Sequence, residues 1–164
     1  MKLSGNVWKF GDDIDTDQIY PGKYLPLTDK KEMGTHAFEG VPDIKDFSAK
    51  VRSGDIAIAG RNFGSGSSRE HAPIAIRESG IQAVLAISFS RIFYRNAINI
   101  GLPIMEIDID TYNSITQGDK IEIDTETGEL RVNGKSFKAF PLSGLEHDIL
   151  VHNGLINYIK EVML

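Results

Sequence analysis

The stretch from Asp55 to Gly80, DIAIAGRNFGSGSSREHAPIAIRESG, decides the fold class. It opens with a short apolar run, Asp55 to Gly60, which is typical of a buried strand, and it continues into a Gly/Ser-rich segment, Asn62 to Glu70. Glu70 to Glu78 then has helical character, and Gly80 follows at a position where glycine commonly ends a helix. The stretch therefore predicts a strand, a loop and a helix.

The same alternation continues downstream. Ala83 to Ile87 predicts a second strand, Arg91 to Ile100 a second helix that Gly101 and Pro103 end, and Ile104 to Ile109 a third strand. Strands that alternate with helices indicate parallel βαβ units, so we expect an α/β fold.

The C-terminal third has a different pattern. Lys120 to Asp124 and Glu129 to Val132, followed by Asn133-Gly134, predict an antiparallel hairpin meander. Two short helices are expected to close the chain, over Leu145 to Val151 and Leu155 to Val162. The predicted sheet is thus mixed rather than purely parallel.

The N-terminal region is expected to be rich in loops. A short apolar segment, Asn6 to Phe10, precedes the acidic turn GDDIDTD. Thr28 to Phe38 predicts a short helix with Thr28 or Asp29 as its N-cap.

Composition limits the function classes. The chain has 164 residues, of which 41% are hydrophobic and 25% charged, and we expect one soluble domain over residues 1–164. Its net charge of -5 disfavours nucleic acid as a partner. No apolar run approaches the roughly 20 residues that span a bilayer, and the N-terminus lacks the apolar core of a secretory signal, so we expect no membrane association and a cytoplasmic protein.

Metal chemistry is limited by residue type. The chain has no Cys, which excludes disulfides, thiolate zinc sites and a Cys-ligated iron–sulfur cluster within it. The four His residues show no metal-ligand spacing. No metal site is expected, and any iron–sulfur cluster would have to sit on a partner.

The Gly/Ser loop is expected to hold an anion. Gly64 and Gly66 allow close approach of the backbone, and a helix N-terminus adds partial positive charge. Arg69 can bind a carboxylate through two parallel hydrogen bonds. A simpler alternative is that Ser67 or Ser68 only caps the following helix. The dinucleotide pattern would need glycine where Arg69 stands, so nucleotide binding is disfavoured.

A serine hydroxyl in such a loop can act as a general acid or base if positive charge and backbone donors stabilise its ionised form. Ser67 and Ser68 both have this placement. Proton removal from the carbon next to a carboxylate would benefit from the same groups, but loss of a hydroxide from the adjacent carbon also needs a Lewis acid. The sequence offers none.

Three long motifs carry a family resemblance. They are GDDIDTDQIYPGKYL (Gly11 to Leu25), NFGSGSSREHAPIAI (Asn62 to Ile76) and SFSRIFYRNAINIGLP (Ser88 to Pro103). Together they resemble the small subunits of the isopropylmalate isomerase family in the aconitase superfamily, over nearly the whole chain. Relatives often have Cys where Ser65 stands, a change between small side chains.

The resemblance implies a swivelling β/β/α domain, like the aconitase C-terminal domain, that closes over a large subunit carrying a [4Fe–4S] cluster. It implies that Ser67 is the catalytic base and that Ser68 and Arg69 bind the substrate carboxylate, with Gly66 letting the backbone come close. Asp17 matches an acidic active-site residue. The implied reaction dehydrates a 2-hydroxy diacid to an alkene and rehydrates it in the other orientation.

The resemblance also places Leu25, Pro26 and Leu27 against the part of the substrate that varies within the family. These residues carry no charge, and burial of a third carboxylate without a partner would be costly, so an isopropyl branch is favoured. The neighbouring Lys23 weakens this inference. A homoaconitase, a dehydratase of 2,3-dimethylmalate or of another methyl-substituted malate, and a stand-alone anion-binding regulatory domain stay open as alternatives.

Overall fold

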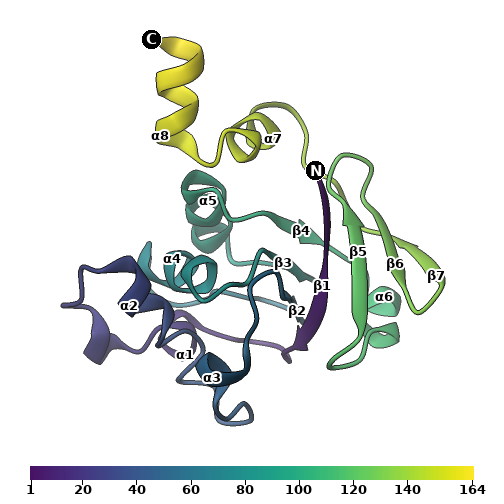
Figure 1. The fold of residues 1–164 in the computed structure, drawn as a ribbon, viewed down its shortest axis with the longest axis horizontal. Helices are drawn as coiled ribbons and strands as arrows, with labels where there is room; N and C mark the ends of the chain where they lie inside the picture. The colour runs from purple at the N-terminus through teal and green to yellow at the C-terminus, as the bar shows by residue number, and fades with distance from the viewer.

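A computed structural model describes residues 1–164 and contains a seven-stranded sheet in the order β4-β3-β2-β1-β5-β6-β7 (Figure 1). Strands β1 to β4 pair in parallel, whereas β5 pairs antiparallel with β1 and begins the meander β5-β6-β7. The mixed α/β prediction is confirmed. The strands are β1 Lys2–Lys9, β2 Ile56–Ala59, β3 Ala83–Ala86, β4 Ile104–Glu106, β5 Lys120–Asp124, β6 Glu129–Val132 and β7 Lys135–Lys138.

Short helices cover the sheet. Helices α1, α2, α4 and α5 gather on one side, and α6 lies on the other side beside the antiparallel strands (Figure 1). The helices are α1 Thr16–Ile19, α2 Lys30–Gly34, α3 Phe47–Lys50, α4 His71–Glu78, α5 Arg91–Ile100, α6 Ile109–Ser114, α7 Gly144–Val151 and α8 Leu155–Tyr158, with a 3-10 turn η1 Gly22–Tyr24 and a π-type turn η2 Ile159–Met163.

The alternation of side chains along β2 builds two hydrophobic cores. Ala57 and Ala59 point into a core that the helices α1, α2, α4 and α5 cover, whereas Ile56 and Ile58 point into a second core. Side chains of β5 and β6 line that second core as well, so the antiparallel strands curl over the far face of the parallel part. Every residue of β2 and β3 is buried, as expected for parallel strands covered on both faces.

Strand β1 is the main element that sequence reasoning underestimated. The apolar segment Asn6 to Phe10 is only its second half, because the strand begins at Lys2. The half from Lys2 to Asn6 pairs with β5, and Val7 to Lys9 pairs with β2. The strand thus joins the parallel half of the sheet to the antiparallel half.

The other helices and strands predicted from the sequence have boundaries close to the observed ones, with two corrections. The strand expected over Ile104 to Ile109 is β4, and it ends at Glu106, because Asp108 caps α6 by accepting a hydrogen bond from the amide of Thr111 at 2.8 Å. The helix expected over residues 28–38 is confined to α2, with Asp29 as its N-cap.

The C-terminal helices agree with the sequence. Helix α8 continues into η2 and extends away from the body of the protein (Figure 1). No helix combines the length and the apolar character needed to cross a bilayer.

Candidate active site

Backbone bridges hold the loop after β2 on two sides. Phe63 pairs with Phe89, which lies in the loop after β3, and Ser65 pairs with Asp15, which precedes α1. The amide of Thr16 also donates to the carbonyl of Ser65 at 2.7 Å. These long-range bridges bring the three sequence motifs together at one end of the parallel strands.

Gly64 allows helix α5 to pack directly against the loop. Its φ is +85°, and a Cβ at this position would lie 2.2 Å from Cγ of Phe93. The hydroxyl of Ser90, which caps α5, donates to the carbonyl of Gly64 at 2.8 Å. Only glycine fits this contact, and the contact sets how closely the loop packs against α5.

The next turn of the loop presents free donors. Gly66 has a φ of +110°, and the backbone N–H groups of Gly66, Ser67 and Ser68 have no acceptor within the chain. Both serines are exposed. Successive unpaired N–H groups on an open surface favour an anionic ligand.

The side chains around Ser67 add further donors. Its Oγ lies 3.4 Å from Oγ1 of the buried Thr16. Arg69 is half-buried, and its Nη1 is buried without a hydrogen-bond partner in the protein. Because buried guanidinium nitrogens are normally satisfied, Nη1 stands out as a donor that the chain itself leaves without an acceptor.

Helix α4 begins directly after the loop. Its N-cap is Glu70, which makes no side-chain capping bond, so neither Ser67 nor Ser68 caps the helix. The capping alternative is therefore wrong: the Ser67 hydroxyl contacts only Thr16, and the Ser68 hydroxyl has no partner within the chain. The N-terminus of α4 still adds partial positive charge near them.

Asp17 and Arg69 approach each other at Gly22. The Oδ1 atom of Asp17 accepts a hydrogen bond from the amide of Gly22 at 2.9 Å. A Cβ placed on Gly22 would lie 3.6 Å from both this oxygen and Nη1 of Arg69. The two side chains form no direct ion pair, so Asp17 anchors η1 beside the arginine.

The segment after η1, Leu25 to Leu27, is partly buried and partly exposed to solvent. Leu25 and Leu27 are half-buried and pack against the helix-covered core, whereas Pro26 is exposed. The Nζ atom of Lys23 lies 5.2 Å from the centroid of the Tyr24 ring. The η1 turn thus lies next to Arg69, and the two leucines that follow η1 pack toward the core.

Two polar residues of this site were missed from the sequence. Thr16 contacts Ser67, and Ser90 anchors Gly64. A signal for Ser90 was present, because a serine directly before a predicted helix is a favoured N-cap. Thr16 lies next to Asp17, but only the fold shows that it meets Ser67.

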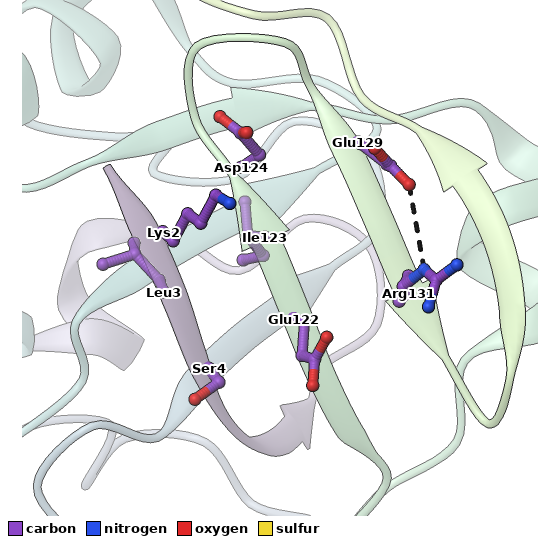
Figure 2. Close-up of a pocket in the computed structure, with 8 residues that line it drawn as sticks. All are labelled: Lys2, Leu3, Ser4, Glu122, Ile123, Asp124, Glu129 and Arg131. Carbon is purple, nitrogen blue, oxygen red and sulfur yellow. Dashed lines mark ion pairs between the residues drawn. The ribbon is translucent and has the colours of Figure 1, made fainter.

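The remaining surface shows no metal site and several separate concavities, one of which lies over the antiparallel strands. No group of three or more His, Asp or Glu side chains is placed to hold a metal ion. An open concavity of about 400 Å³ lies over β1, β5 and β6, with an ion pair between Glu129 and Arg131 at 3.8 Å (Figure 2). The lining of this concavity carries both signs of charge and includes no residue of the Gly/Ser loop. We therefore take the loop, and not this concavity, as the candidate active site.

The fold and this loop define an aconitase-type domain. The family model for the aconitase C-terminal domain matches residues 13–109, which include all the loop and η1 residues described above. The small subunit of 3-isopropylmalate dehydratase from Clostridioides difficile is 51% identical over 98% of both chains. The corresponding subunit from Aquifex aeolicus is 50% identical over 98% of this chain and 96% of its own length.

A solved structure agrees with these relatives. The crystal structure of 3-isopropylmalate dehydratase (leuD) from Methanocaldococcus jannaschii superposes with a TM-score of 0.92, at 47% identity over 98% of this chain and 95% of that chain. The chain belongs to the family of 3-isopropylmalate dehydratase small subunits.

Proposed function

We propose that this chain is the small subunit of a hydro-lyase that interconverts 2-isopropylmalate and 3-isopropylmalate through 2-isopropylmaleate, in leucine biosynthesis. The observation that carries the proposal is the open loop at Gly66 to Arg69, which combines backbone N–H groups that have no acceptor, two exposed hydroxyls and a buried guanidinium nitrogen that has no partner. Membership of the dehydratase family supports the reaction class.

Ser67 is assigned as the catalytic base. In the dehydration its Oγ takes the proton from the carbon next to a substrate carboxylate, and it returns a proton during rehydration. The ionised hydroxyl needs nearby donors, which Thr16 at 3.4 Å and the free backbone N–H groups supply. Arg69 and the N-terminus of α4 add positive charge.

Arg69, Ser68 and Gly66 are assigned to the substrate carboxylate. The unpaired Nη1 of Arg69 can form one arm of a bidentate contact, and the Ser68 hydroxyl and the backbone at Gly66 approach from the loop. Charge that develops on this carboxylate during proton removal is then stabilised in place. Asp17 supports the site by holding η1 against Arg69.

The reaction requires a second chain. This chain contains no Cys and no group of metal ligands, so the [4Fe–4S] cluster is assigned to a large-subunit partner. Such a cluster supplies the Lewis acid that accepts the leaving hydroxide. The exposure of Ser67 and Ser68 fits half of a divided site that the partner covers. We place this assembly in the cytoplasm, with the whole chain acting as one domain.

The apolar branch of the substrate is assigned to Leu25, Pro26 and Leu27. The three residues carry no charge, and the neighbouring Lys23 extends over the ring of Tyr24, with its Nζ 5.2 Å from the ring centroid. A homoaconitate-type substrate is therefore disfavoured.

The test is a side-by-side assay of the purified complex with its large subunit. We expect turnover of 2-isopropylmalate to exceed that of homoaconitate, 2,3-dimethylmalate and citraconate. A higher kcat/KM for any of the other three would overturn the substrate assignment. Failure to co-purify with a cluster-bearing protein would instead favour a stand-alone anion-binding domain.

A further inference from the structure

Tyr24 ends the η1 turn and is held by its side chain. Its ring stacks on the ring of His36, with centroids 3.7 Å apart and planes 13° apart. Its hydroxyl donates a hydrogen bond to one carboxylate oxygen of Glu39. These contacts link η1 to the turn that follows α2.

Glu39 joins the two aromatic residues. Its second carboxylate oxygen lies 2.6 Å from Nδ1 of His36. Burial acts to raise the pKa of Glu39, but the hydrogen bonds from Tyr24 and His36 outweigh it and hold that pKa below its usual value. The hydrogen bond to Glu39 in turn raises the pKa of Tyr24. Glu39 is therefore an anion and Tyr24 a neutral donor at neutral pH, which is the stronger form of the bond.

The turn that carries Glu39 is fixed to the core. The amide of Phe38 donates to the carbonyl of Ile19 at 2.7 Å, and the amide of Gly40 donates to the carbonyl of Gln18 at 3.0 Å. Phe38 is fully buried. Glu39 thus lies between two residues that are hydrogen-bonded to α1, so its backbone is held in place while its side chain reaches η1.

The backbone of Tyr24 connects this attachment to the rest of the site. Its carbonyl accepts hydrogen bonds from the hydroxyl of Tyr20 at 2.6 Å and from the amide of Leu27 at 3.0 Å. The Tyr20 ring stacks on that of His71, the first residue of α4, at 5.8 Å. Tyr24 is therefore the point at which the apolar segment and the neighbourhood of Arg69 are tied together.

We propose that Glu39 and His36 form a clamp on Tyr24 that positions Leu25 to Leu27 and makes the complex selective for a bulky apolar branch. This inference rests on the proposed function and adds positioning residues to it. We assign Tyr24, His36 and Glu39 to positioning and not to catalysis. A loosened clamp lets the segment move, which weakens contact with a large branch more than with a small one.

The test uses Tyr24→Phe, which removes one hydroxyl and keeps the stacked ring, and Glu39→Ala, which removes the acceptor. Tyr94→Phe is the matched control, since the Tyr94 hydroxyl donates to Glu146 at 2.8 Å on a different face, between α5 and α7. Loss of one hydrogen bond to a partly exposed carboxylate predicts about a fivefold to tenfold effect.

Hydrogen exchange of the full chain gives the first readout. We expect the amides of residues 22–25 and of Leu27 to exchange at least about fivefold faster in Tyr24→Phe and Glu39→Ala. Their exchange should be unchanged in Tyr94→Phe. The double variant should exchange little faster than either single variant, because both remove the same bond. Exchange in Tyr24→Phe equal to wild type would overturn the clamp.

Kinetics of the assembled complex give the second readout. Tyr24→Phe should lower kcat/KM for 2-isopropylmalate about fivefold to tenfold, through KM, while hydration of citraconate, which has only a methyl branch, changes less than about twofold. An equal loss for both substrates would overturn the role in selectivity. If the wild-type complex does not turn over isopropylmalate, the proposed function fails and the exchange experiment still decides whether the clamp exists.

Discussion

Replacement of Gly64 by alanine tests the packing of the Gly/Ser loop against helix α5. The new Cβ would lie 2.2 Å from Cγ and 2.4 Å from Cβ of Phe93. Rotation of the phenyl ring cannot relieve this clash, because the Phe93 Cβ is fixed by the backbone of α5. Either the loop or the helix has to move.

Two terms contribute to the expected loss of stability. A non-glycine residue at a φ of +85° costs roughly 1–2 kcal/mol. Overpacking of a tight contact adds about 1–3 kcal/mol. We therefore expect Gly64→Ala to reduce the free energy of unfolding by roughly 2–5 kcal/mol.

Gly118→Ala is the matched control, because Gly118 has a φ of +87° and a Cβ there would meet nothing within 4 Å. Urea unfolding of both variants separates the two terms: the control should lose roughly 1–2 kcal/mol and Gly64→Ala clearly more, with unchanged m-values. Equal urea midpoints for the two variants would refute the reasoning about Phe93.

Three further changes test the site and its support. Arg69→Lys should raise KM for isopropylmalate about tenfold in the assembled complex, because lysine cannot form the bidentate contact. Asp55→Ala should cost about 1.5–3 kcal/mol in urea unfolding, because the buried Asp55 carboxylate accepts the indole N–H of Trp8 at 2.8 Å. Hydrogen bonds from Thr111 hold the pKa of Asp108 below its usual value of 3.8, so the contribution of Asp108 to stability is lost as the pH falls through that lowered pKa. In Asp108→Asn the urea midpoint should therefore fall less than in the wild type between about pH 5 and about pH 3.

Each of these expectations has a clear contradiction. An Arg69→Lys complex with wild-type KM would remove Arg69 from carboxylate binding. Unfolding of Asp55→Ala at the wild-type urea midpoint would show that the Trp8 contact adds no stability. An Asp108→Asn midpoint that falls with pH as steeply as the wild type would exclude Asp108 as the titrating group.

Local patterns predicted the part of the fold that local chemistry determines. The strand before the Gly/Ser loop and the helix after it were placed within a residue or two, because the apolar run and the flanking glycines are strong signals. The hairpin of β6 and β7 followed from Asn133-Gly134. Helix α1 was missed although its capping box, Asp15 and Gln18, is visible in the sequence.

Long-range contacts account for most of what could not be predicted. Nothing in the motif around Asp17 indicates that Thr16 meets Ser67, because the bridge between Asp15 and Ser65 depends on the folded sheet. The pairing of β1 with both β2 and β5 likewise has no local signature. The family resemblance supplied the roles that we propose for Ser67 and Arg69, and their geometry came only from the structure.

Turnover of 2-isopropylmalate by the complex of this chain with its large subunit tests the central claim most directly, with wild type compared to Ser67→Ala. Ser65→Ala is the control, since its side chain has no assigned role. We expect Ser67→Ala to lower kcat by at least about 100-fold, with wild-type affinity for the large subunit and wild-type urea stability. Undiminished turnover in Ser67→Ala would contradict the assignment of this loop as the proton-transferring half of a divided active site.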